Sequence, residues 1–167
     1  MASLHDAKIF GGIGSILMLF VPVVGQILVL IGIKNISDVT NERPVFDNAL
    51  YALIFGIIGS IAGFVPLFMF PLFFTFTLLL PAIIALIAAF IFYLLSAIYL
   101  RKSFNRIAEL LNIGHFKTAA TLYLIGAILT IILVGLIIIF IAEIFMIIAF
   151  FSIPEQPPSP QPPPPPT

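Results

Sequence analysis

The sequence of 167 residues contains no cysteine, and only 8% of its residues are charged. Without cysteine the sequence offers no disulfide, no thiolate zinc site and no cysteine nucleophile. Soluble domains carry about 25% charged residues, so a charge content this low excludes a water-soluble core. The formal net charge of zero also argues against nucleic acid as a partner.

Apolar residues fill most of the chain. They make up 62% of the sequence, and the mean hydropathy is +1.27. A helix needs about 20 apolar residues to cross a hydrocarbon layer about 30 Å thick. We therefore predict an all-α, polytopic membrane helix bundle, which covers residues 9–153 and follows a short N-terminal segment, residues 1–8. Its four transmembrane helices are expected at residues 9–33, 49–65, 74–100 and 119–142.

The first apolar run, Ile9 to Ile33, has no ionisable group. Its length predicts one crossing rather than a cleaved signal peptide, whose apolar region is about 7 to 15 residues long. Pro22 removes a backbone donor and predicts a kink near Met18 to Pro22. The alternative is a re-entrant pair of helices.

Two further features shape the middle of the chain. Pro66 to Pro71 contains no charge and predicts a tight apolar turn at the far interface. Small residues on the apolar helices predict close helix packing, inside one monomer or in a homo-oligomer. These packing residues are Gly56, Gly59, Gly63 and Gly126.

The segment Arg101 to Lys117 holds four of the seven basic residues. Phe104, Ile107, Ala108 and Leu111 follow helical spacing, so we predict an amphipathic helix at residues 101–113 that lies on the membrane surface and ends at Gly114. Residues expected to contact lipid headgroups and to set the topology are Arg101, Lys102, Arg106 and Lys117.

Basic residues also orient the predicted bundle. Every Lys and Arg except Lys8 lies in the two connections 34–48 and 101–117. Because basic residues resist translocation, both connections are predicted to be cytoplasmic in the cell membrane. Four crossings then place both termini outside.

Glu143 interrupts the last apolar run. A charge at a helix centre is costly, so we expect Glu143 at the outer interface, just after the crossing that ends at Ala142. A sharper hypothesis is that Glu143 and Gln26 line an ion or proton pathway. Beyond Ile153, residues 154–167 form a proline-rich tail, which predicts a disordered polyproline II spacer. The sequence does not identify a partner for this tail.

The two halves of the chain also match each other weakly. Phe46, Ala49, Gly56 and Ile58 reappear 70 residues later, beginning with Phe116. The match suggests two repeated helical hairpins, although a sequence this rich in isoleucine and glycine also produces such matches by chance.

No motif for enzymatic chemistry is present, since the sequence has no HExxH, no phosphate-binding loop and no paired acids. We predict no catalytic activity, no metal site and no cofactor. The leading hypothesis is a structural or scaffold protein with membrane lipids as its partners. A transporter or channel component is the first alternative, and lipid-surface sensing through residues 101–112 is the second.

Three segments resemble a known family: AKIFGGIGSILMLFVPVVGQILVLIGIKNISD, RKSFNRIAELLNIGHFKTAATLYLIGAILTIILVG and IIAFFSI. They are similar to archaeal membrane proteins of the domain of unknown function 996 family, over residues 4–153. The resemblance implies a small multi-pass archaeal membrane protein. It implies no activity and no catalytic residue, and the proline-rich tail has no counterpart in the family pattern.

Overall fold

The computed structural model describes residues 2–69, 76–132 and 134–155, and within these ranges the chain is helical throughout. The elements are α1 (Leu4–Met18), α2 (Pro22–Thr40), α3 (Arg43–Met69), α4 (Phe76–Leu111), α5 (Gly114–Leu129), the short 3-10 helix η2 (Thr130–Ile132) and α6 (Val134–Phe151). Five of these helices are long and apolar enough to cross a membrane, and α1 is too short. The prediction of an all-α protein with membrane-type helices is confirmed.

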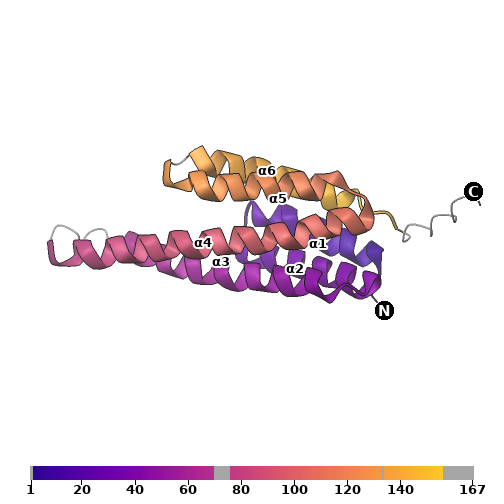
Figure 1. Ribbon diagram of the computed structural model, residues 1–167, viewed down its shortest axis with the longest axis horizontal. Coiled ribbons are helices and arrows are strands. Elements are labelled where there is room, and N and C mark those ends of the chain that lie inside the picture. Colours follow the sequence, from indigo (N-terminus) through magenta and orange to yellow (C-terminus); the bar gives the residue numbers. More distant parts are fainter. Residues whose placement is uncertain (1, 70–75, 133, 156–167) are drawn as a thin grey trace, which may run out of the picture.

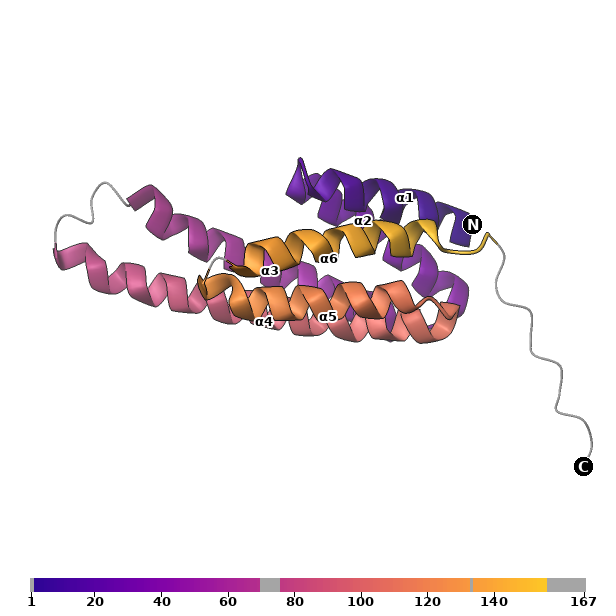
Figure 2. The same cartoon turned by 90° about the horizontal axis from the view of Figure 1, so that it is seen from above.

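The helices pair as three antiparallel hairpins, α1/α2, α3/α4 and α5/α6 (Figure 1). We call the end at which α1, α3 and α5 begin, and at which α2, α4 and α6 end, the polar end. Both ends of the described chain lie there, on the right of Figures 1 and 2. His5 Nδ1 is 3.9 Å from Glu155 Oε1. The sequence placed the termini opposite the two polar connections, and that arrangement is wrong because all four lie at one end.

The first apolar run is not one crossing. Residues 9–33 divide between α1 and α2, which are joined by a turn at Leu19 to Val21. The backbone N–H groups of Leu19 and Phe20 bond to the carbonyls of Ile16 and Leu17, which closes the end of α1. Pro22 then begins α2, a position where its missing N–H costs nothing. The run therefore forms a pair of helices, as the alternative expects.

The predicted crossing at 119–142 is also wrong. It divides between α5 and α6, with η2 between them. The two helices approach so closely that a Cβ on Gly135 would lie 2.2 Å from the carbonyl oxygen of Gly126. No proline or charge marks this turn, so the apolar pattern of the sequence gives no sign of it.

Residues 101–113 do not form a separate surface helix. Residues 101–111 are the last turns of α4, and their apolar face is buried within the bundle. The helix ends at Leu111 because Asn112 adopts a left-handed conformation with φ of 55°. Gly114, the expected end, instead begins α5. Amphipathic spacing predicts that one face of a helix is buried, but it does not say whether lipid or protein buries that face. The pattern therefore could not distinguish a surface helix from the end of a bundle helix.

The central hairpin differs from prediction in its limits. The helix predicted at 49–65 begins at Arg43 and continues past Pro66 to Met69, and the helix predicted at 74–100 covers 76–111. Residues 70–75 of the expected turn and residues 156–167 of the expected tail lie outside the described residues. Three hairpins of unequal length take the place of the two repeated hairpins that the sequence suggested.

The buried core lies in the half of the bundle next to the polar end. At its centre is an aromatic cluster of Phe104, Phe116 and Phe150, one ring each from α4, α5 and α6. Phe116 meets Phe104 and Phe150 edge to face, with ring centroids 5.3 and 5.0 Å apart. Other buried members include Leu4, Ala7, Ile33, Ile36, Val45, Ile107, Met146 and Ile153. The three hairpins are therefore joined at the polar end.

Candidate functional site

Charge is segregated along the bundle. Every Lys, Arg, Asp and Glu except Glu143 belongs to the polar end. These residues lie on α1, on α2, between α2 and α3, on the start of α3 or α5, on the last turns of α4, or directly after α6. The opposite tips of the short hairpins are apolar, and Phe20 and Ile131 there are 77% and 71% exposed. Contiguous exposed apolar surface of this kind marks a contact with membrane or with protein. The two candidate sites are therefore the polar end itself and the vicinity of Glu143.

Arg106 joins two connections at the polar end. Its guanidinium donates hydrogen bonds to Glu42, between α2 and α3, at 2.5 Å and to Glu109, one turn on in α4, at 3.1 Å. The hydrogen bond to Glu42, followed by that to Glu109, raises the pKa of Arg106. The guanidinium is half exposed, so water and salt screen these pairs, and they align α4 with the α2–α3 connection more than they stabilise it.

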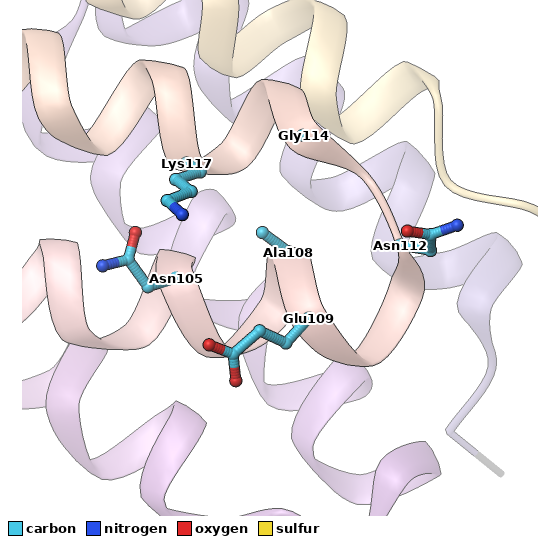
Figure 3. A pocket seen from close by; sticks show the side chains of 6 residues that line it. All are labelled: Asn105, Ala108, Glu109, Asn112, Gly114 and Lys117. Carbon is cyan, nitrogen blue, oxygen red and sulfur yellow. The ribbon is translucent and has the colours of Figure 1, made fainter.

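The other basic residues predicted to contact headgroups also lie at this end. The ammonium group of Lys102 sits 4.8 Å from the ring centroid of Tyr99, a cation–π contact. The Nε of Arg101 is buried without a hydrogen-bond partner among the described residues. Lys117 lies on the first turn of α5, next to α4 (Figure 3). The polar end thus presents basic groups from both α4 and α5.

A cavity of about 290 Å³ lies between the end of α4 and the start of α5. Its lining residues are Asn105, Ala108, Glu109, Asn112, Gly114 and Lys117 (Figure 3). Figure 3 shows the Lys117 side chain directed toward Asn105, whose Oδ1 is buried and has no hydrogen-bond partner within the described chain. The lining offers one carboxylate, one ammonium group and two amides, so it suits a small polar group of either charge.

Glu143 lies in the middle of α6. It is nine residues from the first residue of α6, Val134, which corresponds to about 14 Å of helix. The sequence placed Glu143 just after the end of a crossing, whereas the turn at η2 places the hairpin tip before it and the helix continues on both sides of it. Glu143 is thus the only charged residue of the sequence outside the polar end, and its neighbours along α6 are apolar.

Tyr123 on the neighbouring helix α5 lies near Glu143, and polar groups on α4 and α3 continue from Tyr123. The Tyr123 phenol on α5 is close enough to interact electrostatically with the Glu143 carboxylate and with the Tyr93 phenol on α4. The Tyr93 hydroxyl is in turn 3.1 Å from the Ser60 hydroxyl on α3. We call Ser60, Tyr93, Tyr123 and Glu143 the polar band. Sequence reasoning missed the first three as a group because they are far apart along the chain.

Gln26 does not join this band through a hydrogen bond. It lies on the second turn of α2, close to the tip of the first hairpin, and is partly buried. No hydrogen bond connects Gln26 with Glu143 in the part of the chain that the structure describes. The two residues proposed for one pathway thus come from different hairpins.

The glycines predicted to pack helices differ in how closely they do so. An ideal Cβ on Gly56, Gly59 or Gly63 would lie 3.2 to 3.7 Å from the nearest atom of α4. At Gly126 the nearest atom, from Ile139 of α6, would be at 2.7 Å. All four glycines thus face a neighbouring helix of the same chain.

A similarly close helix approach occurs in the first hairpin, which sequence reasoning did not select for packing. A Cβ on Gly25 would lie 2.3 Å from the Met18 backbone nitrogen and 2.6 Å from the Gly14 carbonyl oxygen. A Cβ on Gly32 would lie 2.7 Å from the Gly11 nitrogen. The available signal was the spacing of Gly25 and Gly32, seven residues or two helical turns apart on one face.

Comparison with known proteins places this architecture in a family. The family model described as "Protein of unknown function (DUF996)" matches residues 21–144, from the end of the α1–α2 turn to just past Glu143. The chain is 30% identical to an uncharacterised protein of Methanocaldococcus jannaschii, over 92% of this chain and 94% of that protein. No solved structure matches the chain. Because the family model covers well over half of the sequence, the chain belongs to the DUF996 family.

Proposed function

We propose that the protein is a structural component of the cell membrane and not an enzyme, and that its polar end lies on the cytoplasmic side. The observation that supports this proposal is the segregation of charge. All seven Lys and Arg residues belong to the polar end, and the tips of the short hairpins are apolar. Since basic residues resist translocation, the polar end is expected in the cytoplasm, with both ends of the described chain. Membrane lipids would then cover the exposed apolar flanks of the helices.

The role of the glycines supports a structural rather than a dynamic protein. Backbones in direct contact at Gly25 and Gly135 leave no space for the helices of each short hairpin to slide. The exposed outer faces of the hairpins remain available for lipids or for a second copy of the chain. A homo-oligomer is therefore part of the proposal, and nucleic acid is not.

Single-cysteine variants test the one-sided topology, because the natural chain has no cysteine. Ala2→Cys, Arg43→Cys, His115→Cys and Ser152→Cys each place a thiol at an exposed position of the polar end. With a membrane-impermeant maleimide on intact cells, we expect no labelling of any variant until the membrane is permeabilised. Labelling of Ala2→Cys and Ser152→Cys but not of the other two would restore four crossings and refute the proposal.

A transport component is the second candidate, and the polar band favours it. An acid within an apolar helix is costly and typically marks a functional position in membrane proteins. The four groups of the band come from four adjacent helices, as an ion or proton path between hairpins would require. Proton or cation flux into liposomes should then fall in Glu143→Gln and be unchanged in Glu109→Gln, an exposed acid at the polar end. Equal flux in Glu143→Gln and the natural protein would remove this candidate.

A further inference from the structure

The hairpins reach different depths in the bilayer. From Arg101 to Phe76, α4 extends over 25 residues, or about 38 Å, and α3 from Asp47 to Met69 extends over 22 residues, or about 33 Å. From Lys34 to Pro22, α2 covers only 12 residues, and α5 from Lys117 to Leu129 also covers 12, each about 18 Å. Figures 1 and 2 show α3 and α4 continuing well past the tips of the other two hairpins.

These lengths can be compared with a bilayer. Its hydrocarbon layer is about 30 Å thick, and each headgroup layer adds about 5 to 8 Å. With the basic residues in the near headgroup layer, the tips of α1/α2 and α5/α6 end near the bilayer midplane. The α3/α4 hairpin reaches the far side. The lengths that qualify α2 and α5 as crossings include turns beside or beyond these basic residues, so their apolar reach is shorter than the helix. The end of α6 lies level with the start of α5, because Phe150 packs against Phe116, the residue before Lys117.

The cross-section of the protein therefore differs between the two leaflets. Six described helices lie in the leaflet next to the polar end, and two lie in the opposite leaflet. With a helix diameter of about 10 Å, each helix occupies about 80 Å², so the near leaflet holds about 300 Å² more protein. A rigid insertion of this shape expands one leaflet relative to the other.

The shape is fixed, because the short hairpins cannot be drawn apart or extended easily. The aromatic cluster and the buried core join all three hairpins at the polar end. The tip of the first hairpin carries Phe20 at 77% and Val23 at 65% exposed, so it favours hydrocarbon over the far aqueous side. The four short helices thus extend little into the far leaflet.

From this asymmetry we propose that the protein is a membrane-bending wedge, which favours bilayers that are convex on the side of its polar end. The inference deepens the proposed structural function and rests on it, since both require the polar end to lie on one side. The wedge acts on the bilayer itself, and the proposal does not involve the polar band or the cavity.

Depth is tested first, with single tryptophans, because the natural chain has none. Phe20→Trp and Ile131→Trp place the indole at the tips of the two short hairpins, and Leu80→Trp places it on the part of α4 beyond them. In vesicles of phosphatidylcholine brominated at defined chain positions, we expect both tip tryptophans to be quenched most by bromine near the chain ends. Leu80→Trp should be quenched most by bromine near the headgroup. Strong headgroup-proximal quenching of the tip tryptophans would mean full crossings and would overturn the wedge.

Curvature preference is tested on the full-length protein in giant vesicles. An Ala2→Cys variant carries one fluorophore at the polar end, and an impermeant quencher reports which way each population faces. On a narrow tube pulled outward from the vesicle, protein with its polar end outside should be enriched relative to the parent vesicle. Protein with its polar end inside should be depleted, so the opposite orientation serves as the matched control.

The two proposals fail in different ways. If some cysteines of the polar end are labelled from outside the cell and others only from inside, the structural proposal and the wedge are both refuted. One-sided labelling combined with equal density on tube and vesicle in both orientations would refute only the wedge. That result would be expected if a second copy filled the far leaflet beneath the short hairpins.

Discussion

The sharpest test of the packing is Gly25→Ala in the first hairpin. The added Cβ would lie 2.3 Å from the Met18 nitrogen and 2.6 Å from the Gly14 oxygen. Both obstructing atoms are backbone atoms, so no side-chain rotation relieves the contact. Ordinary contacts at this position begin near 3.4 Å, which requires α1 and α2 to separate by about 1 Å.

The size of the effect follows from two opposing terms. Overpacking a tight contact costs about 1 to 3 kcal/mol, and backbone obstruction places this site in the upper part of that range. Replacing a helical glycine with alanine returns about 1 kcal/mol through helix propensity. We therefore expect Gly25→Ala to lower the free energy of unfolding by about 1 to 2 kcal/mol.

Gly63→Ala is the matched control, because its Cβ would meet only the Ala89 Cβ at 3.7 Å, an ordinary contact. That variant should gain stability, by about 0.5 to 1 kcal/mol. Unfolding by SDS in mixed micelles, followed by circular dichroism, measures both values, and hydrogen exchange should rise in α1 and α2 of Gly25→Ala alone. If the two variants change stability by the same amount and with the same sign, the tight hairpin described here is incorrect.

Three further substitutions probe the polar end, and the same unfolding assay measures each. Phe104→Ala removes one ring of the aromatic cluster, 1% exposed, and should cost about 3 to 5 kcal/mol; a loss below 1 kcal/mol would contradict its place in the core. Ser103→Ala removes a 2.7 Å hydrogen bond from a buried hydroxyl to the Val45 carbonyl and should cost about 1 kcal/mol, whereas Ser152→Ala, at an exposed position, should be nearly neutral. Asn112→Val places a β-branched side chain at φ of 55° and should cost about 1 to 2 kcal/mol, whereas Asn112→Gly should be tolerated; equal stability of these two variants would exclude a left-handed residue there.

Some of the fold could be predicted from the sequence with good reason. Long apolar runs identify membrane-type helices, since each must satisfy its own backbone hydrogen bonds in lipid. The start of the bundle near Lys8, the polar connection at residues 34–48 and the basic segment at 101–117 are also visible as breaks in apolar composition. These features depend on local sequence.

The turns inside the apolar runs could not be predicted in the same way. A run of 25 apolar residues from Ile9 to Ile33 has the right length for a crossing. Whether it crosses or folds back depends on whether Gly14 and Gly25 meet, and that is a contact between two helices. At Thr130 to Val134 even a proline is missing, so only the close approach of Gly126 and Gly135 reveals the turn.

The candidate sites also contain residues that the sequence could reveal and residues that it could not. Glu143 was recognisable from sequence, because a single acid in an apolar run is conspicuous. No local pattern in the sequence singled out Tyr123 or Tyr93 as its partners. The proximity of Tyr123 to Glu143 arises because α5 and α6 pack side by side, which no local pattern records.

The sequence by itself determined the helical class of this protein and its membrane-type composition, because hydrocarbon imposes its demands residue by residue along each helix. Membership of the DUF996 family followed in the same way, from the order of apolar and glycine residues. Only the tertiary structure decided that the apolar runs fold into three hairpins, that both described ends meet at the polar end, and that the hairpins differ in length. The physical reason is that helices in lipid are paired by close backbone contact between small residues, and such contacts join positions whose distance along the chain is not encoded in either segment alone.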